Sequence, residues 1–113
     1  GRRKNLWAQS LRARIVLGRE PWTKVDRLLF GAMVEARSCE RFKLLGDAVE
    51  DDAELQKLYR GLWASEHGHY RTFIQLAEEI LPEKAVAKRW NEMLDLEAEI
   101  IQNQPPGPRM HGT

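Results

Sequence analysis

Residues 55–80, LQKLYRGLWASEHGHYRTFIQLAEEI, decide the predicted fold of this chain. One stripe at α-helical spacing runs through them, at positions 55, 59, 62, 66, 69, 73, 76 and 80. Six of these eight positions are apolar or aromatic, and the two exceptions are Glu66 and His69. An ionised glutamate is costly to bury without a partner, so this stripe indicates a polar site as well as a core face.

The stretch before it predicts a second long helix, antiparallel to the first. Residues 21–49 carry apolar side chains at helical spacing, and the acidic run at residues 50–52 is expected to form the turn. Asp51 and Glu54 have capping-box spacing for the helix that follows, which Pro82 ends. A further helix is predicted from Pro82 to about Asn103. In no stretch do apolar and polar residues alternate as they would in a strand, so the predicted fold class is all-α.

Glu35 joins Glu66 and His69 if the two helices pair about this turn. Counting outward from residues 50 and 51 brings Glu35 level with Glu66, and His69 then faces the small side chain of Ala32. Two carboxylates at one level repel each other, and a divalent metal ion between them removes the repulsion. One Glu facing a Glu-x-x-His pair is half of the ligand set of dinuclear four-helix bundles. We therefore predict a metal site made by Glu35, Glu66 and His69.

A second interpretation requires no metal. Glu-x-x-His is a short, degenerate pattern that average composition produces by chance in roughly one chain of this size in ten. A buried His69 would then donate to a backbone carbonyl, and Glu35 would pair with Arg37 or Arg41. On this interpretation the chain is a metal-free helical interaction module.

Length and composition indicate one domain with a modest core. The chain has 113 residues, of which 42% are hydrophobic. The lone Cys39 offers no disulfide framework, and no apolar run approaches the length of a membrane span. The expected compartment is therefore the reducing cytoplasm, without membrane contact. The chain opens with Gly1 rather than Met, which suggests a fragment or a processed product.

Positive charge gathers at the start of the chain. Residues 1–19 contain six basic residues and no acidic residue, although the net charge of the chain is only +1. Such a segment is expected where a protein meets a polyanion such as RNA; the alternative is an amphipathic helix with a basic exposed face. The domain is thus expected to comprise a basic helix at 1–19, a helical bundle part at 21–103 and an extended, proline-rich tail at 104–113.

Two strings in the hairpin resemble a known family. MVEARSCERFKLL (Met33–Leu45) and LYRGLWASEHGHYRTFIQLA (Leu58–Ala77) resemble the tRNA-(2-methylthio-N6-isopentenyladenosine) hydroxylases, which are ferritin-like nonhaem diiron monooxygenases. The resemblance runs from about Glu20 to Gly112. It implies that the three predicted ligands bind iron. It also implies that O2 and two electrons from a reductase hydroxylate the isopentenyl side chain of a modified adenosine in tRNA.

The same resemblance implies roles for two further groups of residues. An apolar wall would keep water from the reacting centre, although an ordinary core position is the alternative for each of its members, and basic residues would hold tRNA phosphates. The candidates for the wall are Phe42, Tyr59, Leu62, Tyr70 and Phe73, and those for the phosphates are Arg2, Arg3, Lys4, Arg12 and Arg14.

This chain departs from the family pattern in two ways. Where the family has Ala-Arg inside Ser-Glu-Ala-Arg-His-Tyr, this chain has His67-Gly68, and the glycine weakens a helix. The family also has two earlier bundle helices with another Glu and another Glu-x-x-His. Two copies of this chain about a two-fold axis would restore that ligand set and complete a four-helix bundle. We therefore expect a homodimer, or a truncated product of a longer hydroxylase; a non-catalytic, metal-binding ferritin-like homodimer is the alternative.

Overall fold

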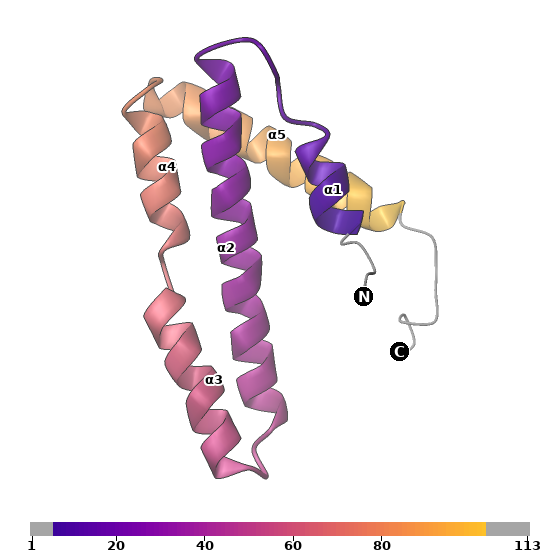
Figure 1. The fold of residues 1–113 in the computed structure, drawn as a ribbon, viewed down its shortest axis with the longest axis vertical. Coiled ribbons are helices and arrows are strands. Elements are labelled where there is room, and N and C mark those ends of the chain that lie inside the picture. Colours follow the sequence, from indigo (N-terminus) through magenta and orange to yellow (C-terminus); the bar gives the residue numbers. More distant parts are fainter. Residues whose placement is uncertain (1–5, 104–113) are drawn as a thin grey trace.

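The computed structural model describes residues 6–103, and within this range the chain forms five helices and no strand (Figure 1). The all-α prediction is confirmed. No helix of the described part is long and apolar enough to cross a membrane. The helices are α1 (Leu6–Arg12), α2 (Trp22–Ala48), α3 (Ala53–Glu66), α4 (Tyr70–Glu78) and α5 (Glu83–Gln102).

The predicted hairpin is present, with α3 and α4 lying end to end along the antiparallel helix α2 (Figure 1). Its turn differs from the prediction by one residue, because Asp52 rather than Asp51 caps α3. The Asp52 side chain accepts a hydrogen bond from the Leu55 backbone N–H at 3.1 Å. The backbone at Asp52 is extended, as an N-cap requires, while Asp51 still lies in the turn.

The helix predicted to run unbroken through the Glu-x-x-His pair is divided in two. The His67 backbone N–H bonds to the Trp63 carbonyl at 2.7 Å where α3 ends. Gly68 then has a φ of +86°, in the left-handed region that glycine enters without a steric penalty. The prediction of one helix was therefore wrong at Gly68, and the break lies between two of the predicted metal ligands.

Two buried ion pairs hold α5 across α2. The fully buried Asp26 of α2 accepts from Arg89 of α5 through two bonds of 2.8 Å, and also from the Val16 backbone N–H at 2.9 Å. The second pair joins Glu97 of α5, whose side chain is 4% exposed, to Arg37 of α2 at 2.6 Å. Because charges so far from water are costly unless paired, these bonds fix where α5 crosses.

The core lies at the end of α2 where α1, α4 and α5 meet it. By contrast, α3 contains no buried residue. The α2–α3 part of the hairpin therefore extends beyond the remaining helices with one side uncovered (Figure 1). The buried core residues are Leu11, Val25, Leu29, Met33, Ala77, Val86, Met93 and Ile100.

The two ends of the chain are described only in part. Helix α1 ends at Arg12, so it is shorter than the basic helix expected over residues 1–19. Residues 1–5 and the predicted tail at 104–113 lie outside the described residues.

Candidate metal centre

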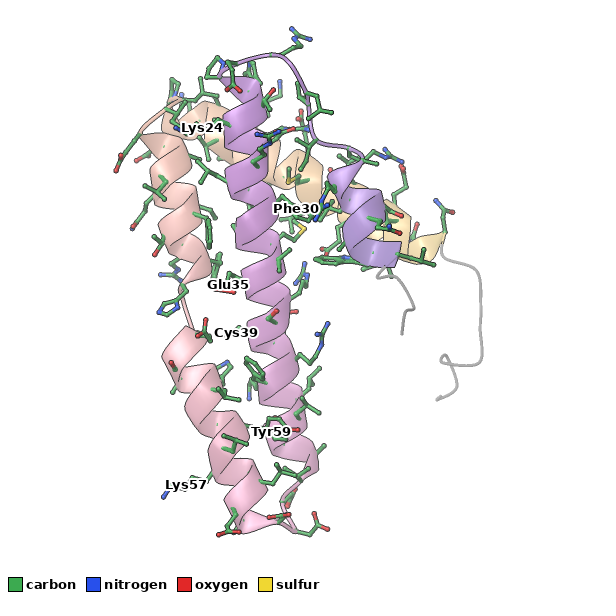
Figure 2. The ribbon with its side chains drawn as sticks, viewed as in Figure 1. Lys24, Phe30, Glu35, Cys39, Lys57 and Tyr59 are labelled. Carbon is green, nitrogen blue, oxygen red and sulfur yellow. The ribbon has the colours of Figure 1, made fainter. Side chains whose placement is uncertain are left out.

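The three predicted ligands come together at the break between α3 and α4. Glu35 lies in the middle of α2, Glu66 is the last residue of α3, and His69 directly precedes α4. One ligand atom of each lies within 4.8 Å of the other two, and His69 Nδ1 is 3.4 Å from Glu66 Oε1. Figure 2 shows Glu35 at the level of the break. The register deduced from the turn is therefore present in the fold.

The cluster is more exposed than the sequence predicted. The side chains of Glu66 and His69 are 37% and 57% exposed, and Glu35 is half-buried. The expectation of a buried carboxylate was wrong because α2 is the only described helix that covers this stretch of α3. Burial alone therefore does not force a cation into the cluster.

The donor set nevertheless fits a metal ion. Two carboxylates and one imidazole are ligands that suit iron and similar divalent metals. The cluster is also free of the competing ion pairs that the metal-free interpretation required. Arg37 instead binds Glu97 and Glu40, and within the described residues Glu35 makes no ion pair with Arg41. The exposed His69 is not a satisfied core histidine.

Cys39 lies one helical turn beyond Glu35 but does not join the cluster. Its Sγ donates to the Trp63 carbonyl at 3.9 Å. Burial raises the pKa of the Cys39 thiol, and the charges of Glu66 and Glu35 raise it further. The group of ligand atoms that lie within 4.8 Å of one another comprises Glu35, Glu66 and His69, without Cys39.

The five residues predicted to form an apolar wall lie on α2, α3 and α4. Phe73 of α4 packs closely against Gly31 of α2, where an added Cβ would lie 3.1 Å from the ring. Tyr70, one of the five predicted residues, lines a cavity. This cavity, of about 400 Å³, lies between α2, the break and α5, and two tryptophans that sequence reasoning missed, Trp63 and Trp90, also line it. The signal that could have found Trp63 is its position one turn before Glu66.

The predicted phosphate contacts fall into three groups. Arg2, Arg3 and Lys4 lie outside the described residues. Arg14 forms an exposed ion pair with Glu99 at 3.2 Å. The guanidinium carbon of Arg12 lies 5.7 Å from the centre of the Phe30 ring, beside a hollow of about 650 Å³.

Comparison with known proteins decides the family. The family model described as tRNA-(MS[2]IO[6]A)-hydroxylase (MiaE) matches residues 3–112. The chain belongs to this family. No solved structure matches the chain.

Two curated relatives carry the name tRNA 2-(methylsulfanyl)-N(6)-isopentenyladenosine(37) hydroxylase. The protein of Pseudomonas putida is 39% identical over 105 residues, which cover 93% of this chain and 50% of the relative. That of Salmonella typhimurium is 38% identical over 92 residues, covering 81% of this chain and 33% of the relative. This MiaE-family chain thus spans between a third and a half of the length of these two relatives.

Proposed function

We propose that this chain provides half of a diiron centre that hydroxylates the isopentenyl side chain of a modified adenosine in tRNA. The observation that carries the proposal is the Glu35, Glu66 and His69 cluster, with ligand atoms within 4.8 Å, in a chain of the MiaE family. Iron held by these residues would supply the activation of O2 that hydroxylation of a C–H bond requires. Two electrons, two protons and O2 would give the alcohol and one water, and we infer a reductase as the electron source.

The residues of the cluster have distinct tasks in this proposal. The carboxylates of Glu35 and Glu66 would hold the metal ions and offset their charge. His69 supplies a neutral nitrogen donor, and Glu66 Oε1, 3.4 Å from Nδ1, orients its ring. Cys39 is not a ligand in this proposal, because its Sγ donates to the Trp63 carbonyl.

We further propose that a second copy of the chain completes a ferritin-like four-helix bundle. The uncovered side of the hairpin carries exposed leucines, with Leu58, Leu62 and Leu76 exposed by 56%, 36% and 43%. Apolar surface of this kind favours a partner of matching chemistry. Two copies about a two-fold axis would bring four carboxylates and two imidazoles together.

Arg12 is the described residue that best supports a contact with tRNA phosphates. It makes no ion pair with a carboxylate among residues 6–103, whereas Arg14 is paired with Glu99. A non-catalytic metal-binding dimer is the second candidate function. The exposure of His69 favours it, because an active centre has to exclude water.

Metal analysis and a tRNA assay test the proposal together. The chain is loaded with Fe(II), its iron content is measured, and it is incubated with isopentenylated tRNA, O2 and a reductant. Nucleosides are then identified by mass spectrometry. His69→Ala should weaken Fe(II) binding more than about a hundredfold, since removal of even an outer partner of a ligand costs ten- to a hundredfold. His67→Ala, outside the cluster, is the matched control for iron binding only.

We expect iron binding to be retained better than hydroxylation. A symmetric dimer duplicates one half-site, and misplacement of reacting groups by about 1 Å costs on the order of a hundredfold in rate. The longer Pseudomonas putida relative, assayed in parallel, should be the more active protein. Equal iron content in the wild type and His69→Ala would refute the ligand assignment.

A further inference from the structure

We propose that the cavity of about 400 Å³ behind the helix break binds the modified base itself, an adenine with an alkyl group on N6. This inference rests on the proposed function, because it names the position of that function's substrate. The residues that carry it are Cys39, Trp63, His67, Gly68, Tyr70 and Trp90, all of which line the cavity.

The walls of this cavity are suited to a flat aromatic ring. The two indoles come from different helices, Trp63 from α3 and Trp90 from α5, and Tyr70 opens α4. The Trp63 and His67 rings contact each other in a tilted arrangement, with centroids 4.5 Å apart and planes inclined by 31°. Aromatic side chains are the surfaces against which proteins hold bases that have left a nucleic-acid stack. A volume of about 400 Å³ is within the range of small-molecule pockets.

The cavity adjoins the metal cluster through two small residues. Gly68 lies in the chain between Glu66 and His69, and it also lines the cavity. Cys39 lies one turn from Glu35 on α2 (Figure 2), and it also lines the cavity. An alkyl group directed toward Cys39 and Gly68 would therefore approach the three ligands, while the ring stays between the aromatic side chains.

A second hollow continues from this cavity on the side away from the cluster. It has a volume of about 300 Å³ and shares Lys43 and Trp63 with the first, to which it adds Arg60. Lys43 and Arg60 both pair with the exposed Asp47, at 3.5 and 3.7 Å. Exposed pairs of this length are weak, so a phosphate group can compete for both cations. The two hollows together fit a nucleotide, with its base in the first and its phosphate at Lys43 and Arg60.

The four tryptophans of the chain provide a direct test. Each indole N–H gives a separate signal in a nitrogen–proton correlation spectrum of the ¹⁵N-labelled chain. On titration with N6-isopentenyladenosine, without metal, the signals of Trp63 and Trp90 should shift. Those of Trp7 and Trp22, which do not line the cavity, should stay in place. Unmodified adenosine should bind at least about fivefold more weakly, because it buries no alkyl group.

Two variants complete the test. Trp63→Ala should weaken nucleoside binding at least about fivefold, the lower limit for loss of one base-stacking partner. Trp22→Ala, the matched control, should leave binding unchanged. Absent or equal shifts at all four indoles would overturn the inference, and so would equal affinity for both nucleosides. Iron binding and hydroxylation are measured separately, so failure here leaves the proposed function to be judged by its own assay.

Discussion

His69 Nδ1 lies 3.4 Å from Glu66 Oε1, although the helical run that carries both is interrupted at Gly68. In an unbroken helix, residues three apart are neighbours on one face. Here the chain turns at Gly68 with a positive φ, and the His69 backbone N–H donates to the Glu66 carbonyl at 3.1 Å, which closes the turn and keeps the imidazole beside the carboxylate. The contact between the two ligands therefore depends on one backbone angle.

Substitution of two glycines should separate this effect from ordinary helix propensity. Gly68→Ala should lower the free energy of unfolding by about 1–2 kcal/mol, since an L side chain is strained at a φ of +86°. Gly61→Ala, inside α3 with open space around it, should raise that free energy by about 0.5–1 kcal/mol. Urea unfolding followed by circular dichroism measures both. If both substitutions raised the free energy of unfolding, or both lowered it, the left-handed turn at Gly68 would be contradicted.

The Asp26–Arg89 pair should contribute far more to stability than a surface pair. Arg89→Met leaves a fully buried carboxylate without its cation, and we expect a loss of about 3–5 kcal/mol in the free energy of unfolding. Lys43→Met breaks the exposed pair with Asp47 and should cost less than about 1 kcal/mol. The same urea titration compares the two. Similar losses would show that α5 is held by apolar packing instead.

The exposed leucines of the hairpin should determine the assembly state. Leu58→Glu, on α3, should convert a dimer into monomers, because it places a charge in an apolar contact. Leu44→Glu is the control: Leu44 is 69% exposed but lies nine residues from Glu35, about two and a half turns away on the opposite side of α2. Analytical ultracentrifugation at micromolar concentration shows whether each variant is a dimer or a monomer. A folded wild-type monomer of 13.1 kDa would refute the dimer.

Cys39 should react slowly with iodoacetamide near neutral pH. Burial and the charges of Glu66 and Glu35 raise the pKa of its thiol, and only the thiolate is reactive. Glu66→Gln removes one charge, lowers that pKa and should speed alkylation. Glu92→Gln, whose carboxylate does not act on Cys39, is the control.

The raised pKa of the Cys39 thiol also affects the stability of the chain at alkaline pH. The unfolded chain loses the thiol proton first as pH rises, so the contribution of Cys39 to stability is complete below the unfolded pKa and declines above it. Alkylation rates measured across a pH series, with mass spectrometry as the readout, give the pKa directly. A rate in the folded chain equal to that in urea would contradict a raised pKa.

The sequence by itself determined the all-α class, the long antiparallel hairpin and the level of Glu35 with Glu66. These features follow from local rules, because helical period, a polar turn and residue counting fix which side chains of a hairpin meet. It also pointed to Gly68 as a weak position in the helix. Nothing in the helical pattern, however, specified the backbone angle that the chain adopts there.

Only the tertiary structure decided the exposure of the cluster and the position of the aromatic cavity. Exposure depends on which helices cover a face, and a periodic pattern predicts burial whether or not a covering helix is present. The cavity requires Trp63 and Trp90, far apart in sequence, to meet where α5 crosses α2. That crossing is fixed by Arg89 with Asp26 and by Arg37 with Glu97, pairs that no local spacing identifies. Long-range ion pairs of this kind are a property of the packed chain.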